Sequence, residues 1–269
     1  MKLFVSRLFI LGLSFFLIAL PIVNGRPSAD DKNGVVKKAR SAYYNLKDAG
    51  LTSFQCAVTV NWDRSAPTFP KDDPFSTEKG RQAMNAIKFP LAVSMDGGFD
   101  LSAPTIAYTG DPNLDKRLSN SPAYVNQMMG NFFQAWRSFA VGTFLPSSDS
   151  NYVVKETVDK YQITYKENGT NVDLNLAKDY QVSDLTINAT DFKIHMQPTF
   201  IKTTKGFLIS GVDSDATDPG GVQIHITLGI KYQNVEGFAL PTKVSYDITT
   251  GKTLTSFDVS FIDYKIKKN

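Results

Sequence analysis

The chain has few of the residues that build disulfides and metal sites: its 269 residues include one cysteine and two histidines. A single cysteine cannot form a disulfide within the chain, so a hydrophobic core has to supply the stability. Cys56 falls on the apolar side of a strand-like segment, together with Phe54 and Val58. A reactive thiol needs a basic neighbour or a helix N-terminus, and the nearby sequence offers neither, which predicts a buried, unreactive thiol.

Two histidines and one cysteine make a poor ligand set for a metal ion. His195 and His225 both fall on the polar side of strand-like segments, which predicts surface positions. Asp213, Asp215 and Asp218 lie in one predicted turn and could hold a hard cation, but this turn lacks the Gly at position six and the Glu at position twelve of an EF-hand. A polar hairpin is the favoured interpretation, so we predict no metal site and no cofactor.

The sequence also lacks a glycine motif that could cradle a phosphate, and its charge is weak. With 29 basic and 26 acidic residues, the net charge of +3 is too small and too dispersed for nucleic-acid binding. Ser76 and Lys79 match a Ser-x-x-Lys pattern, but no Ser-Asp-Asn or Lys-Thr-Gly element accompanies them, which indicates a chance match. We therefore predict a protein that is not an enzyme, with no catalytic residues.

One apolar run stands near the N-terminus, from Leu8 to Val23. Its 16 residues fall short of the ~20 that a membrane-spanning helix needs. Lys2 and Arg7 form a basic region ahead of it, and a cleavage site near Gly25 follows, as in a signal peptide. We therefore predict that the first 25 residues are removed and that the protein is periplasmic or secreted.

Two segments have the apolar spacing of amphipathic helices. The first runs from Asp30 or Asp31 to Ala49, with its apolar residues inside an arc of roughly 120°. The second runs from Ala123 to Phe144, and its apolar arc of roughly 160° is rich in aromatic residues and methionine. Such a face either packs on a sheet as core or lines an apolar ligand cavity.

Period-2 alternation predicts strands through the rest of the chain. The predicted strands are 54–62, 91–94, 105–108, 152–154, 161–165, 172–176, 185–189, 192–196, 206–212, 222–232 and the two arms of a hairpin between Gly237 and the C-terminus. A short helix is expected between Glu78 and Ile87. Consecutive strands with short connections predict a mostly antiparallel α+β fold with a strongly curved or closed sheet.

The leading helix, the strand that begins Leu51-Thr-Ser-Phe-Gln-Cys, and the closing residues Gly237-Phe-Ala-Leu-Pro241 and 257–266 resemble the LolA/LolB superfamily of periplasmic lipoprotein carriers and related lipid-binding proteins. This resemblance implies a half-open barrel whose mouth is covered by helices, and an acyl chain held between sheet and helices. It implies lipid or an acylated protein as partner, with transient membrane contact. The cavity would be lined by Val125, Met128, Met129, Phe132, Phe133, Trp136, Phe139, Tyr246, Phe257 and Val259.

With 42% hydrophobic residues the chain can build a substantial core, and no break in composition marks a domain boundary. We predict one LolA-like domain over residues 26–269, with a helical insertion around residues 63–150. Two functions stay open: an exported lipid or lipoprotein carrier, and an exported structural or interaction module with a fully packed core. A Phe133→Arg variant is expected to abolish lipid binding and to leave the fold largely intact.

Overall fold

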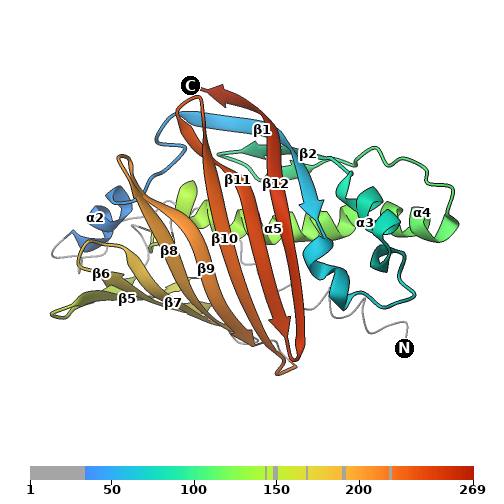
Figure 1. Ribbon diagram of the computed structural model, residues 1–269. Coiled ribbons are helices and arrows are strands. Elements are labelled where there is room, and N and C mark those ends of the chain that lie inside the picture. The colour runs from blue at the N-terminus through green and yellow to red at the C-terminus, as the bar shows by residue number, and fades with distance from the viewer. Residues whose placement is uncertain (1–33, 143, 148–150, 168, 190–191, 218–219) are drawn as a thin grey trace. The chain divides into compact units, whose positions relative to one another are not determined.

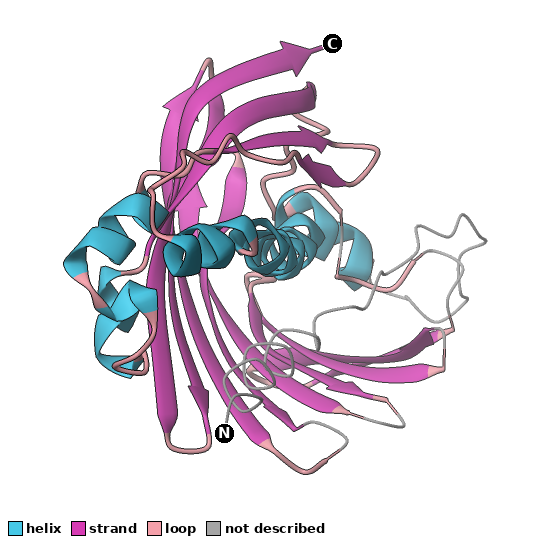
Figure 2. Cartoon of the chain, turned by 90° about the vertical axis from the view of Figure 1, so that its right-hand side faces the viewer, coloured by secondary structure: helices cyan, strands magenta, loops and turns pink. Residues whose placement is uncertain are grey.

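The computed structural model describes residues 34–142, 144–147, 151–167, 169–189, 192–217 and 220–269. The predicted signal peptide lies outside these residues. About half of the chain is strand, and a few helices accompany the sheet, which confirms an α+β class that is mostly antiparallel β (Figure 2). No helix among the described residues is long and apolar enough to cross a membrane.

The elements follow the order shown in Figure 1. The helices are α2 (Val35–Ser41), η2 (Asp63–Thr68), η3 (Pro74–Ser76), α3 (Glu78–Asn85), α4 (Pro112–Ser119) and α5 (Ser121–Ala140). The strands are β1 (Leu51–Asn61), β2 (Phe89–Ser94), β3 (Phe99–Leu101), β4 (Tyr152–Glu156), β5 (Lys160–Glu167), β6 (Thr170–Ala177), β7 (Val182–Asn188), β8 (Lys193–Thr203), β9 (Gly206–Thr217), β10 (Gln223–Val235), β11 (Phe238–Thr250) and β12 (Thr253–Lys268).

The twelve strands form one sheet in the order β3-β2-β1-β12-β11-β10-β9-β8-β7-β6-β5-β4. The sheet has two ends, β3 and β4, and is not closed. The chain divides into two compact units. Unit 1 comprises the residues up to 45 and residues 134–227, and unit 2 comprises residues 46–133 and 228–269. The prediction of a single domain stays a prediction, and we describe each unit by itself.

In unit 1, the strands from β4 to β9 form an antiparallel meander with one apolar face. Leu174 on β6 lies opposite Leu185 on β7, and Leu185 lies opposite Met196 on β8. All three are buried, whereas the intervening positions carry polar residues. The period-2 alternation predicted this arrangement, because alternate side chains of a strand point to opposite faces.

The first helix is shorter than predicted. Instead of reaching Ala49, α2 ends at Ser41, because the chain then pairs with β9. The Phe207 N–H donates to the Ala42 carbonyl at 2.7 Å, and the Tyr44 N–H donates to the Phe207 carbonyl at 2.9 Å. These bonds use backbone groups that a longer helix would need for itself.

Tyr43 links this segment to the turn between β6 and β7. Its hydroxyl donates to the Tyr180 carbonyl at 3.1 Å and accepts from the Val182 N–H at 2.7 Å. Tyr180 has a φ of 71°, a left-handed conformation that is uncommon for tyrosine. Burial raises the pKa of Tyr43, because a charged phenolate would be poorly solvated there. The Tyr43 hydroxyl therefore stabilises a strained turn.

We expect Tyr43→Phe to lower the free energy of unfolding by about 1–3 kcal/mol, because it leaves the buried Val182 N–H without an acceptor. Tyr44→Phe is the matched control, since the Tyr44 hydroxyl is buried and has no hydrogen-bond partner among the described residues. Chemical denaturation of both variants measures the difference. Equal losses in the two variants would contradict this role of Tyr43.

In unit 2, β11 and β12 form the hairpin that the sequence predicts. Tyr246 lies opposite Phe257, Val244 lies opposite Val259, and all four are buried. Gly251, with a φ of 59°, begins the two-residue turn, a conformation that glycine adopts without steric cost. β12 then pairs with β1, so that Phe261 lies opposite Val58. The hairpin thus belongs to a larger sheet.

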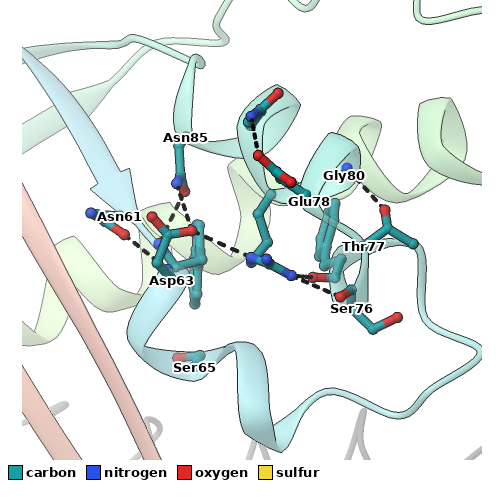
Figure 3. A network of polar contacts seen from close by, with 12 residues as sticks. Asn61, Asp63, Ser65, Ser76, Thr77, Glu78, Gly80 and Asn85 are labelled. Atoms are coloured by element: carbon teal, nitrogen blue, oxygen red, sulfur yellow. Dashed lines mark hydrogen bonds and ion pairs between the residues drawn. The ribbon is translucent and has the colours of Figure 1, made fainter.

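The segment after β1 is held by a polar network (Figure 3). The Asp63 N–H donates to Asn61, Asn85 donates to the Asp63 carboxylate at 3.3 Å, and the Trp62 N–H donates to Asn85 at 3.0 Å. Arg81 forms an ion pair with Asp63 at 3.4 Å and donates to the Ser76 carbonyl. These bonds tie η2, η3 and α3 to the end of β1.

One prediction for unit 2 was wrong, and one helix was not predicted. No strand forms at 105–108; β3 instead covers Phe99–Leu101, where Phe99 pairs with Val93. α4 was not predicted; it begins after Asp111, whose carboxylate accepts from two backbone N–H groups of the first turn. The predicted helix within 78–87 and the strand within 91–94 are confirmed as α3 and β2.

Candidate functional site

The ten residues predicted to line a cavity are all buried in the structure. Eight of them belong to unit 2, and Trp136 and Phe139 belong to unit 1. Seven of the unit 2 residues are at most 2% exposed: Val125, Met128, Met129, Phe132, Phe133, Phe257 and Val259. Side chains this inaccessible face neither solvent nor a water-sized void.

In unit 2, aromatic rings fill the space beside these residues. The Phe133 ring lies 5.3 Å from Phe99 and 5.0 Å from Phe132, and both Phe132 and Phe133 contact Phe261 on β12. Such edge and offset contacts stabilise a core beyond the area that they bury. This first part of α5 therefore packs directly on the sheet through its own side chains.

The hairpin end of unit 2 has a second group of rings. Tyr246 stacks on Phe257 at 4.7 Å, and Trp62 lies 5.3 Å from Phe257. The Tyr246 hydroxyl is buried and has no hydrogen-bond partner among the described residues, and burial raises the pKa of this group. Leaving a buried hydroxyl unpaired costs about 1–3 kcal/mol. It is a point where the polar atom of a ligand could bind.

In unit 1, the last turns of α5 join a cluster of aromatic rings. Phe139 lies 4.5 Å from Phe144 and 5.6 Å from Phe200 on β8. Tyr43 contacts Phe144 and Phe200, with ring distances of 5.0 and 5.3 Å. This cluster borders the apolar face of the β4–β9 meander.

Ser214 is the exception on that apolar face. It lies on β9 opposite Met196 and between Val212 and Ala216, and it is 2% exposed. Its hydroxyl has no hydrogen-bond partner within the described part of the chain. A buried hydroxyl among apolar side chains is unfavourable unless it is bonded, so Ser214 marks a second position suited to a polar atom of a ligand.

The apolar face of unit 1 is less tightly closed than the helix-covered part of unit 2. Ile226 is 9% and Met196 is 7% exposed, although both lie on this face. Ile187 is half-buried, whereas its cross-strand neighbours Val172 and Ile194 are buried. The face around Ser214 therefore has more accessible apolar surface than the ring cluster of α5 and β12.

Arg40 adds a cation to unit 1. Its guanidinium donates to the Pro146 carbonyl, and its Nε is buried and has no partner among the described residues. No carboxylate in the described ranges forms an ion pair with Arg40. A partly buried guanidinium without a counter-ion is suited to bind an anionic or strongly polar head group.

The residues of the Ser-x-x-Lys pattern do not form a nucleophile site. Ser76 ends η3, and its hydroxyl donates to the Lys71 carbonyl at 3.1 Å, while Lys79 is exposed on α3. Cys56 is buried on β1, as predicted, and burial raises the pKa of its thiol to about 12. The thiol stays protonated near neutral pH and is a poor nucleophile.

The predicted turn at 213–221 was wrong in its first part. Asp213 and Asp215 lie on β9, which continues to Thr217, and both point to the polar face. Asp218 lies outside the described residues. His195 and His225 lie on the polar faces of β8 and β10, as predicted. The strand register brings His225 to Asp215, with 2.9 Å between its Nδ1 and a carboxylate oxygen.

Ser214 and Arg40 were not predicted from the sequence. Ser214 stands at an inward position of an alternating apolar pattern. A hydroxyl at such a position could have predicted a buried polar atom. Arg40 lies between Ala39 and Ser41 and has no comparable signal, because its burial depends on the packing of α2 within unit 1.

Comparisons with protein-family models, with curated proteins and with solved structures found no match. The fold itself defines the class of this protein: an α+β protein with a mostly antiparallel sheet.

Proposed function

We propose that the protein is an exported lipid or lipoprotein carrier. An acyl chain would lie along the apolar face of the sheet, and the sheet would form the curved, half-open barrel with covering helices that the resemblance to the LolA/LolB superfamily implies. Its partner would be a lipid or an acylated protein, met during transient membrane contact.

The observation that carries this proposal is the unpaired Ser214 hydroxyl within an otherwise apolar, incompletely closed face. An acyl chain matches the apolar surfaces of Met196 and Ile226. Because Ser214 is only 2% exposed, the side chains that cover it would have to move aside before an ester or amide oxygen could accept its hydrogen bond. Arg40 supports the same class of ligand, because its guanidinium can bind a polar head group. We place the ligand on the face of unit 1 around Ser214; of the ten predicted residues, only Trp136 and Phe139 belong to this unit.

A second function is favoured by the ring contacts of Phe132, Phe133 and Phe261. These side chains fill their own surroundings, as in a structural or interaction module with a packed core. The two functions differ in whether the purified protein retains an apolar molecule.

The test is native mass spectrometry of protein purified without detergent from a lipid-rich host, with lipid analysis of an organic extract. We expect a bound species that carries an acyl chain. Absence of any bound lipid, together with no response of fluorescent fatty-acid probes, would refute the carrier proposal and favour the packed module.

Ser214→Ala gives a sharper prediction. In the unliganded protein we expect the free energy of unfolding to rise by about 1 kcal/mol, because an unpaired buried hydroxyl is removed, while affinity for the retained lipid falls. Ser65→Ala is the matched control: Ser65 is equally buried, but its hydroxyl donates to the Ser256 carbonyl, so its loss should destabilise the protein. Denaturation curves and lipid titration measure both effects. A destabilised Ser214→Ala protein would contradict this role of Ser214.

A further inference from the structure

Both histidines of the chain lie on the polar face of unit 1, among aspartates on neighbouring strands. His195 on β8 lies opposite Asp215 on β9, and His225 on β10 contacts Asp215 from the other side. Asp213 stands two residues before Asp215, so it points to the same face. His225, Asp213 and Asp215 place one ligand atom each within 4.8 Å of one another.

The contacts of His225 define the state of its ring. The Nδ1 atom lies 2.9 Å from a carboxylate oxygen of Asp215, and an ionised carboxylate only accepts hydrogen bonds. Nδ1 therefore carries the proton in the neutral ring, and Nε2 carries the lone pair. A carboxylate that accepts from one nitrogen while the other nitrogen binds the ion is the arrangement that orients metal-binding histidines.

Nε2 of His225 and two nearby oxygen atoms form a group of three possible metal ligands. Nε2 lies 3.7 Å from Oδ2 of Asp213 and 3.3 Å from Oγ1 of Thr227, and these two oxygens are 3.4 Å apart. Two ligands of a tetrahedral ion, each at about 2.0–2.1 Å from the metal, are separated by about 3.4 Å. The separation of 3.7 Å is long for a hydrogen bond, but it suits two atoms that share an ion.

We propose that this cluster is a site for a divalent transition-metal ion such as Zn²⁺. Nε2 of His225 and a carboxylate oxygen of Asp213 bind the ion, Thr227 supplies a weaker oxygen, and water completes the coordination at this exposed surface. Asp215 orients the imidazole. Nitrogen and oxygen donors of this kind suit Zn²⁺, whereas Ca²⁺ prefers six or more oxygens.

His195 provides a control within the same face. Its Nε2 lies 3.1 Å from Asp184, and its Nδ1 lies 3.2 Å from the Thr186 hydroxyl, so both ring nitrogens already have partners. Among the described residues, His195 does not belong to a group of three possible metal ligands, whereas His225 lies within 4.8 Å of two aspartates. The two histidines share strand context and exposure but differ in the number of carboxylates beside the ring.

The experiment is isothermal titration calorimetry with Zn²⁺ as the probe, at pH 7.5, on the purified protein and its variants. We expect one Zn²⁺ per chain, at least a tenfold loss of affinity in His225→Ala and in Asp213→Asn, and a loss of about tenfold in Asp215→Asn. His195→Ala should bind as the unaltered protein does. Circular dichroism checks that each variant is folded, which we expect because all four side chains are exposed or partly exposed.

Absence of heat of binding at millimolar Zn²⁺ would overturn the proposal, as would equal affinity of His225→Ala and the unaltered protein. Loss of binding in His195→Ala to the same extent would also overturn it, because it would place the ion elsewhere on this face.

Discussion

Phe133→Arg is expected to destabilise unit 2 strongly. Phe133 is 1% exposed, and its ring contacts Phe99, Phe132 and Phe261. An arginine here would remove these contacts and bury a charge, a combination that costs about 4 kcal/mol or more. At the lower end of the usual domain stability of about 5–15 kcal/mol, such a loss removes most of the stability. Chemical denaturation followed by tryptophan fluorescence measures the effect.

Asn126→Arg on the same helix is the matched control. Asn126 is exposed, so its replacement should change stability by no more than about 0.5 kcal/mol. A folded Phe133→Arg protein of near-normal stability would show that this side chain borders open space. The sequence pattern led to the opposite expectation, a folded variant without lipid binding, because spacing identifies an apolar face but does not say how tightly it is packed.

Gly206→Ala is the second large effect, and it acts on unit 1. Gly206 has a φ of 116°, and a Cβ added there would lie 2.6 Å from the Ala42 carbonyl oxygen and 2.9 Å from backbone atoms of Tyr43 and Tyr44. Backbone atoms cannot rotate away as a side-chain end can. We expect a loss of about 3 kcal/mol or more, through strain and through separation of Tyr43 from β9.

Gly229→Ala tests whether this loss is specific. Gly229 also lies in a strand, but its φ is not positive and an added Cβ meets no atom within 4 Å. The free energy of unfolding of the Gly229→Ala protein should stay within about 0.5 kcal/mol of that of the unaltered protein. Thermal unfolding of both variants provides the comparison, and similar melting temperatures for Gly206→Ala and Gly229→Ala would contradict the close approach of residues 42–44.

Much of the fold could be predicted where the pattern is local. The β11–β12 hairpin follows from alternating apolar residues around Gly251, and the strands predicted after Pro146 are all present. The helix predicted from Ala123 to Phe144 is present as α5, with its ends shifted by a few residues. Periodicity of this kind depends only on the geometry of one element.

Prediction failed where a partner distant in sequence decides the structure. α2 ends early because residues 42–44 hydrogen-bond with Phe207, more than 160 positions later. β9 extends through Asp213 and Asp215 because β8 pairs with it along this stretch. The polar composition of that stretch indicated a turn, but cross-strand hydrogen bonds outweigh the weak preference of aspartate for turns.

The sequence by itself determined the class of fold, the faces of the strands and the aromatic side of α5, because these follow from local period and residue type. Only the tertiary structure decided which apolar residues are fully packed, where a hydroxyl is left unpaired at Ser214, and that Asp213 meets His225. These properties depend on strand register and on close packing between distant segments, which local periodicity does not encode.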